Sequence, residues 1–265
     1  MISNYVIGSW NYRHFIFSSV KGEILGRFAR SKIGALWMIL HPLAMALIYV
    51  LVLSEVLGAK IGGVENKAAY AIYLMAGISA WGLFSEISLR CLNLFIEYKS
   101  ALKKIMFPRI CLPIIVWLGA SLNHLILLTV IFFIFILYGH MPTVHWLAIP
   151  LGFLLLSAFG FGVGVLTGIL NVFSRDVGQF MTVIFNLWFW LTPIVYTKEI
   201  LPDAIASFME FNPIVAFVAI YQDAMLYHRW PDWSSLIPPT LLVIGILFLA
   251  MLAFRRASPE LVDVL

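Results

Sequence analysis

Long apolar stretches fill most of this 265-residue chain, and they decide which solvent it folds in. A helix needs about 20 apolar residues to cross a bilayer core of about 30 Å, and backbone amides in lipid must be satisfied within their own segment. Six stretches are near or above this length, so each predicts a membrane-spanning helix. They are Leu36–Leu57, Tyr70–Phe95, Ile110–Tyr138, Trp146–Leu170, Val177–Tyr196 and Leu236–Phe254.

The composition excludes a water-soluble domain. Only 11% of the residues are charged and 62% are hydrophobic, whereas soluble domains have about 25% charged residues. The fold class we expect is an all-α integral membrane protein with one domain of six spans. Its parts are an amphipathic interface-helix region (1–32), spans one to five (33–196), an outer re-entrant pair of helices (197–233), span six (234–255) and a cytoplasmic tail (256–265).

The positive charges fall mainly on one side of the predicted spans. With a cytoplasmic N-terminus and six alternating helices, thirteen Lys and Arg lie inside and four lie outside. This asymmetry is typical of membrane proteins and places both termini in the cytoplasm. It also explains the net charge of +4 through orientation and contact with anionic membrane lipids, without a nucleic-acid partner.

The segment before the first span looks like an amphipathic helix that lies in the membrane interface. Its expected apolar face is Phe17, Val20, Ile24 and Phe28, and its expected polar face is Glu23, Arg27 and Arg30. Such a helix serves either as an anchor or as a lever that touches a partner, and the pattern alone leaves both open.

Ionisable groups inside a span are costly, and they usually face each other or a cavity. Glu86 and Arg90 are four residues apart on one helical face, so they predict either an ion pair or the lining of a polar path. Tyr73 and Trp81 lie on the same span. In the third span, His124 is expected to be a hydrogen-bonded structural residue.

The main loop between spans, Glu97–Arg109, reads as a short basic amphipathic helix that stops before Pro108. An apolar stripe of Tyr98, Leu102 and Ile105 would lie along it. This pattern suits binding to the membrane surface or docking into the groove of a partner protein.

Two further features concern packing and topology. Gly160, Gly164 and Gly168 are spaced so that two helix backbones can approach closely, within one subunit or between two. The tract Leu201–Trp233 is apolar but interrupted by Asn212-Pro213, and a seventh span there would place the last basic residues outside. We therefore expect it to dip in and return on the outer side.

Several kinds of chemistry have no motif here. The sequence contains no G-x-x-x-x-G-K-[ST] phosphate loop, so we expect no ATP site of that type in this chain. No spacing of Cys and His suggests a metal site, and we expect Cys91 and Cys111 to be packing residues. The interpretation that remains is that the chain is a pore or permease driven by another protein.

The order of several short motifs resembles the membrane subunit of type-2 ABC exporters of cell-surface polysaccharides, above all O-antigen exporters. Each motif is weak alone, but the ordered set covers nearly the whole chain. The motifs are Arg30-Ser31-Lys32-Ile33-Gly34-Ala35-Leu36-Trp37 with His41-Pro42-Leu43, Lys104-Ile105-Met106-Phe107-Pro108-Arg109, Leu112-Pro113, Phe173-Ser174-Arg175-Asp176-Val177, Thr192-Pro193-Ile194-Val195-Tyr196 and Phe211-Asn212-Pro213.

The resemblance implies a permease in the bacterial inner membrane with four kinds of partner: a second copy of itself, a dimer of ABC ATPase subunits, a lipid-linked polysaccharide and membrane lipids. It implies no cofactor in this chain, since ATP and Mg would bind the ATPase. It also implies roles for residues. These are ATPase coupling (Glu97, Tyr98, Lys99, Ser100, Leu102, Lys103, Lys104), the interface helix (Phe17, Val20, Ile24, Arg27, Phe28, Arg30), an aromatic-lined channel or polar path (Tyr73, Trp81, Glu86, Arg90, Trp188), a cytoplasmic motif (Arg175, Asp176) and an outer gate (Pro202, Asn212, Pro213).

Three alternatives stay open at this point. The cargo of such an exporter could be teichoic acid, capsule or a small amphipathic drug. The chain could instead be a membrane enzyme or scaffold of glycolipid assembly, which would need carboxylates near the interface. The candidates for that chemistry are Glu97, Asp176, Glu199 and Asp203, and they are divided between the two faces.

Overall fold

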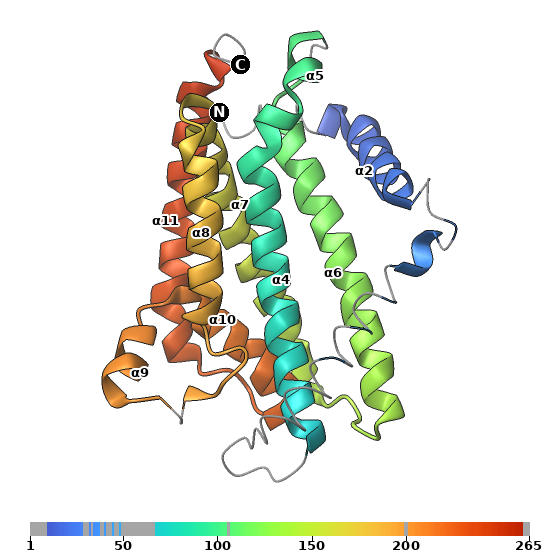
Figure 1. Cartoon of the computed structure of the whole chain (residues 1–265), viewed down its shortest axis with the longest axis vertical. Helices are drawn as coiled ribbons and strands as arrows, with labels where there is room; N and C mark the ends of the chain where they lie inside the picture. Colours follow the sequence, from blue (N-terminus) through green and yellow to red (C-terminus); the bar gives the residue numbers. More distant parts are fainter. Residues whose placement is uncertain are drawn as a thin grey trace.

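The protein is a bundle of helices that run back and forth between two ends (Figure 1). The computed structural model describes residues 10–28, 32, 34–37, 40, 44, 48, 67–104, 107–198 and 201–261. The helices in this part are α2 (Arg13–Phe28), η1 (Gly34–Leu36), α4 (Lys67–Glu97), α5 (Lys99–Lys104), α6 (Cys111–Leu137), η3 (Val144–Ala148), α7 (Ile149–Phe173), α8 (Asp176–Trp190), α9 (Asp203–Met209), α10 (Pro213–Gln222), η5 (Asp223–Tyr227) and α11 (Trp233–Ala257).

Within the described residues, four helices are long and apolar enough to cross a bilayer: Ala69–Glu97, Cys111–Leu137, Val144–Phe173 and Trp233–Ala257. They correspond to the predicted second, third, fourth and sixth spans. The fifth is the 15-residue helix α8, which is shorter. Most of the predicted first span lies outside the described residues, so the count of six stays a prediction.

Helices α4 and α7 form the centre of the bundle. The most apolar windows of both are 61% buried, against 17% for α11. Helix α6 packs beside α4, α11 packs beside α7, and the short α10 contacts all of α4, α7 and α11.

The three glycines of α7 face α4 of the same chain. A Cβ atom on Gly168 would lie 2.3 Å from the carbonyl oxygen of Cys91, and one on Gly164 would lie 2.6 Å from the Cys91 Cβ. A Cβ on Gly160 would meet the carbonyl oxygen of Phe84 at 2.9 Å. The small face predicted from the sequence therefore serves packing within the protomer, where it brings the two central backbones together.

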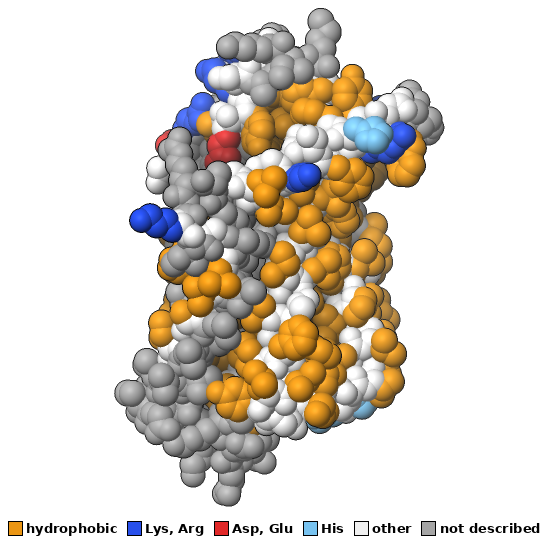
Figure 2. Space-filling view, turned by 90° about the vertical axis from the view of Figure 1, so that its right-hand side faces the viewer, with side chains coloured by type: hydrophobic (Ala, Val, Ile, Leu, Met, Phe, Trp, Pro, Cys, Tyr) orange, Lys and Arg blue, Asp and Glu red, His pale blue; other side chains and the backbone are white. Residues whose placement is uncertain are grey.

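One end of the bundle is rich in Lys and Arg. Helix α5, the turn between α7 and α8, and the last turn of α11 all lie there (Figure 1), and Lys and Arg gather toward it on the surface in Figure 2. Arg109 ties the loop before α6 to the end of α11 by donating to the Ser258 hydroxyl at 3.3 Å. We call it the basic end, and its cations are Lys99, Lys103, Arg109, Arg175, Arg255 and Arg256.

The interrupted tract after α8 forms two short helices at the opposite end, α9 and α10 (Figure 1). Asn212 caps α10 by accepting a hydrogen bond from the Ile214 backbone N–H at 3.1 Å, and Pro213 occupies the first helical position, where its missing N–H costs nothing. The Asn-Pro pair thus breaks the tract as predicted, and neither helix is long enough to cross a bilayer.

Helix α8 ends just before Pro193, and the chain then runs without regular structure to Thr197. Its carbonyl groups are satisfied by side chains of other helices. The Tyr73 hydroxyl donates to the carbonyl of Pro193 at 2.9 Å, and the Gln222 amide donates to the same carbonyl at 3.1 Å. The Tyr70 hydroxyl donates to Val195 at 2.7 Å. Such irregular backbone is tolerated in an apolar bundle because it is buried in protein.

Helix α2 docks on α6 through a face that differs from the predicted one. Ile16 and Val20 are buried against Cys111 and Ile115, whereas Phe17 is 64% exposed. The predicted apolar face is therefore divided, because Val20 and Ile24 pack on α6 while Phe17 is exposed, and the assignment to an interface helix stays a prediction. A spacing of four residues keeps Ile16, Val20 and the half-buried Ile24 within an arc of about 80°, and Phe17 lies at the edge of this arc, about 20° beyond Ile24. The side chains of Arg27 and Phe28, and all of Arg30, lie outside the described residues.

Candidate functional site

Helix α5 presents a basic surface at the basic end. Leu102 is buried and Tyr98 is half-buried against the core, while Lys99, Ser100 and Lys103 are exposed. The predicted amphipathic pattern of this helix is therefore present in the structure. Glu97 is also exposed, whereas Ile105 and the side chain of Lys104 lie outside the described residues. The assignment of this helix to ATPase coupling stays a prediction.

The predicted pair of Glu86 and Arg90 is part of a larger polar cluster. Arg90 pairs with Glu86 at 3.3 Å and with Glu23 of α2 at 2.5 Å. The Asn123 amide of α6 donates to Glu86 at 2.7 Å. A Cβ at Gly119 would lie 3.3 Å from the Arg90 guanidinium, so the small residue makes room for it. The cluster joins three helices, and it includes an acidic partner that the sequence had assigned to the solvent face.

Several aromatic residues of α4 and α8 pack inside the protomer. Trp81 is buried, and its ring contacts Phe84 and Phe189. The Trp188 indole N–H donates to Asn212 at 2.9 Å, which ties α8 to the start of α10. Tyr73 is buried as well. The assignment of Tyr73, Trp81 and Trp188 to the wall of a channel stays a prediction about the assembled transporter.

Two histidine contacts serve structure. His124 lies within hydrogen-bond distance of the Tyr221 hydroxyl at 3.0 Å, as expected of a buried structural histidine. At the end opposite the basic end, the ring of His228 stacks on that of His140 with centroids 4.9 Å apart. Partial burial, and then the neighbouring His140 and His145, hold the pKa of His228 below its usual value.

Helix α8 carries a polar stripe on its exposed side. Arg175, Gln179, Thr182 and Asn186 follow one another at steps of four, three and four residues, which places them within an arc of about 60°. All four are exposed in the protomer. The opposite side of the helix packs on the core, with Phe185 buried there. We call these four residues the polar stripe.

A second exposed arc lies beside the polar stripe, and it is wholly apolar. Its members are 57–64% exposed: Phe180, Val183, Leu187 and Trp190. An apolar surface of this kind suits lipid or a protein partner. In the polar stripe, the Thr182 hydroxyl donates to the Gly178 carbonyl at 2.9 Å and the Asn186 amide donates to the Thr182 carbonyl at 3.0 Å, both within α8. The Arg175 guanidinium and the Gln179 amide have no such partner among the described residues, and groups of this kind inside a bilayer usually face water or each other. The exposed side of α8 thus has two arcs of different chemical character.

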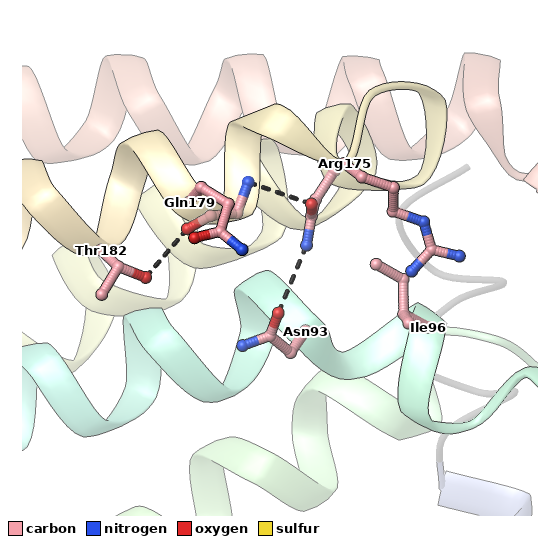
Figure 3. A pocket seen from close by; sticks show the side chains of 7 residues that line it. Asn93, Ile96, Arg175, Gln179 and Thr182 are labelled. Carbon is pink, nitrogen blue, oxygen red and sulfur yellow. Dashed lines mark hydrogen bonds between the residues drawn. The ribbon is translucent and has the colours of Figure 1, made fainter.

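The polar stripe begins at a cavity of about 310 Å³ between α4, α7 and α8, at the basic end (Figure 3). One cation, three amide side chains and a hydroxyl contribute to its wall, and none of its described lining residues is acidic. They are Asn93, Ile96, Asn171, Arg175, Gly178, Gln179 and Thr182.

Asn171 fixes the shape of this cavity. It is 2% exposed, its amide donates to the carbonyl of Leu92 at 2.9 Å, and its carbonyl oxygen accepts the backbone N–H of Gly178 at 3.0 Å. A Cβ atom at Gly178 would lie 2.9 Å from that oxygen, so only glycine lets α8 approach so closely. These contacts hold the first turn of α8 beside α4 and α7.

The sequence motif predicts Arg175 as a functional residue but not the rest of the cavity or of the polar stripe. Asp176, the other half of the predicted motif, is exposed in the first turn of α8 and does not line the cavity. The signal that could have revealed the stripe is the helical spacing of Gln179, Thr182 and Asn186 in an otherwise apolar span. Asn93 and Asn171 come from other helices, and only the fold brings them there.

Comparison with known proteins identifies the family. The family model described as ABC-2 type transporter matches residues 14–226, which is most of the chain. The chain belongs to the ABC-2 type transporter family. The match includes α5, the α7–α8 turn and α10, and it confirms the resemblance inferred from the ordered motifs.

Several curated proteins are similar over most of their length. The O-antigen export system permease protein RfbA of Klebsiella pneumoniae is 28% identical over 76% of this chain and 75% of its own. The protein of the same name from Myxococcus xanthus is 25% identical over 96% of both. The polysialic acid transport protein KpsM of Escherichia coli is 21% identical over 88% of this chain and 89% of its own.

Proposed function

We propose that this chain is the permease subunit of an exporter that moves a lipid-linked polysaccharide, of the O-antigen kind, across the bacterial inner membrane. Two copies would enclose a channel between them. The observation that carries the proposal is the exposed polar stripe of α8. The Thr182 hydroxyl donates to the Gly178 carbonyl at 2.9 Å and the Asn186 amide donates to the Thr182 carbonyl at 3.0 Å, both within α8. The Arg175 guanidinium and the Gln179 amide have no such partner among the described residues, and their exposure favours a water-filled path or a polar partner. A hydrated glycan offers hydroxyl groups along its whole length.

The family membership supports export as the activity, and the names of its relatives support a polysaccharide as the cargo. O-antigen and polysialic acid are both long hydrophilic chains, and a path lined by amide and hydroxyl groups beyond Arg175 suits such a chain better than a small drug. Teichoic acid and capsule remain alternative cargoes of the same class. A membrane enzyme of glycolipid assembly is less well supported, because the cavity beside the polar stripe has no acidic residue among its described lining residues.

The energy would come from a separate ATPase dimer that binds ATP and Mg. The sequence has no phosphate loop of its own, and the exposed lysines of α5 offer a docking surface. This docking would place the basic end in the cytoplasm, which the distribution of Lys and Arg supports. Both termini would then be cytoplasmic, and α9 and α10, with Pro202, Asn212 and Pro213, would form a re-entrant gate at the outer end.

Cysteine scanning along α8 tests the channel wall. We expect Thr182→Cys and Asn186→Cys to react with a membrane-impermeant maleimide when the assembled transporter is in membranes. The neighbouring Val183→Cys and Leu187→Cys are matched controls in the apolar arc and should stay unreactive. The two native cysteines are buried and free, so their background is small. Equal labelling of all four positions would contradict a water-filled path along the polar stripe.

Charge reversal on α5 tests the docking surface. We expect Lys103→Glu with Lys104→Glu to abolish copurification of the ATPase subunit and to reduce surface glycan in cells that depend on this permease. Arg255→Glu with Arg256→Glu makes the same change of charge at the same end, on α11, and should leave copurification intact. Unchanged binding by the α5 variant would remove the coupling role from this helix.

A further inference from the structure

We propose that the cavity at the start of the polar stripe binds the phosphate ester head group that joins the glycan to its lipid. This inference rests on the proposed function and names the part of the cargo that the cavity would recognise. It concerns a site formed by Arg175 together with Asn93 and Gln179, at the basic end of α8 (Figure 3).

The charge of the cavity favours an anion. Arg175 is its one cation, and the described lining residues include no carboxylate to neutralise it. Neither the Arg175 guanidinium nor the Gln179 amide makes a hydrogen bond or ion pair with another described residue, so their N–H donors remain available. A guanidinium can bind two phosphate oxygens at once, and amide N–H groups can bind the remaining oxygens.

The size and depth of the cavity favour a head group over a sugar chain. Its volume of about 310 Å³ is at the lower end of the range of about 300–1,000 Å³ for ligand sites, which fits a small group such as a phosphate ester. Arg175 lies at the start of α8, and Thr182 lies about 10 Å further along the helix axis. The cavity therefore begins at the level where lipid head groups meet water, and Ile96 supplies an apolar wall for the adjoining lipid.

The position of the cavity also fits the order of transport. The polar stripe continues from Gln179 through Thr182 to Asn186, away from the basic end. A head group held at Arg175 would keep the lipid at the cytoplasmic interface while the attached sugars reach the polar stripe. Asn171 is a positioning residue in this arrangement, because its hydrogen bonds are already used to hold α4 and α8 together.

Ligand binding to the purified full-length permease in nanodiscs tests the inference without an ATPase and without transport. The probes are farnesyl diphosphate, farnesol and inorganic diphosphate. We expect farnesyl diphosphate to bind more tightly than either of the others. Arg175→Gln should weaken its binding by about 10- to 100-fold, the range for losing hydrogen bonds to a charged group. Arg175→Lys should weaken it less, because the charge remains but the paired geometry is lost.

Arg256→Gln is the matched control, since it removes an exposed guanidinium at the same end but outside the cavity. Its binding should equal that of the wild type, and each variant should elute as a folded protein in gel filtration. Equal binding of farnesyl diphosphate by Arg175→Gln and wild type would overturn the site. Inorganic diphosphate binding as tightly as the farnesyl ester would overturn a lipid source for the phosphate. Failure of the proposed function would give a different result. In that case Thr182→Cys and Asn186→Cys would not react with the maleimide, while the wild-type protein would still bind farnesyl diphosphate.

Discussion

Replacing Gly168 by alanine tests the packing at the centre of the bundle. The new Cβ atom would lie 2.3 Å from the carbonyl oxygen of Cys91 and 3.5 Å from the Leu92 Cα. Real Cβ atoms essentially never come within 3.0 Å of another heavy atom, and a backbone carbonyl in a helix cannot rotate away as a side chain can. Helices α4 and α7 must therefore separate by about 0.7 Å at this point.

The cost follows from the contacts that such a gap weakens. A separation of about 0.5–1 Å loses a quarter to a half of the dispersion energy between the atoms concerned, and overpacking a dense interface costs about 1–3 kcal/mol. Alanine regains up to about 1 kcal/mol through its better helix propensity. We expect a net loss of about 1–2 kcal/mol, which corresponds to a fall in melting temperature of roughly 3–8 °C for a chain of this size.

Gly245→Ala in α11 is the matched control, because nothing lies within 4 Å of the Cβ position there. It should be neutral or slightly stabilising. Both variants can be compared in one detergent by heating, removing aggregates and measuring the remaining folded protein by fluorescence-detected gel filtration. A Gly168→Ala protein that melts at or above the wild-type temperature would refute the argument, and so would an equal loss in Gly245→Ala.

Three further predictions concern single contacts. Asn212→Ala should lower the melting temperature more than Asn212→Asp, because alanine loses a helix cap worth about 1 kcal/mol and the acceptor of the Trp188 indole; equal melting of the two variants would contradict this. Glu23→Gln should speed deuterium exchange in α2, because the ion pair between Glu23 and Arg90 joins α2 to α4. Exchange in α7 should stay unchanged. Unchanged exchange in α2 would contradict this prediction. The lowered pKa of His228 means that the folded protein binds fewer protons there than the unfolded chain, so stability is lost as pH falls below about 6.5. His228→Gln should therefore reduce the fall in melting temperature between pH 7 and pH 5, and an identical fall would show that other groups cause it.

The features that the sequence predicted well are those set by short-range periodicity. Gly160, Gly164 and Gly168 of α7 repeat every four residues, so they predict a surface for close helix packing even when the partner helix is unknown. The same holds for α5 and the residue before it, where Tyr98 and Leu102 are one turn apart while Lys99 and Lys103 are exposed. The break at Asn212-Pro213 is also local, because a cap and a proline define a helix start on their own.

The features that the sequence missed depend on contacts between distant segments. Glu23 and Arg90 are 67 positions apart, and no pattern within α2 shows that its glutamate faces protein instead of solvent. The hydroxyl of Tyr73 satisfies a backbone carbonyl 120 positions away, a role that only the fold can reveal. The division of the apolar face of α2 could not be predicted either, because Ile16, Val20, Ile24 and Phe17 lie within one arc of about 100° and the pattern does not show which of them contact α6.

In α8, the polar residues are more informative about function than the aromatic residues that the sequence made prominent. Trp188 and Phe185 hold the helix to the core, and Phe185 is the one residue of α8 that is buried within the protomer. Helix α8 therefore has little packing within the protomer, and its exposed side has one apolar arc and one polar arc. Lipid alone does not suit both arcs. The apolar arc can meet lipid or a second copy. In the polar stripe, the Arg175 guanidinium and the Gln179 amide have no hydrogen-bond partner among the described residues, so water or a polar ligand suits them better than lipid. For this reason we regard the protomer as half of a path, with α8 as the wall that the cargo would touch.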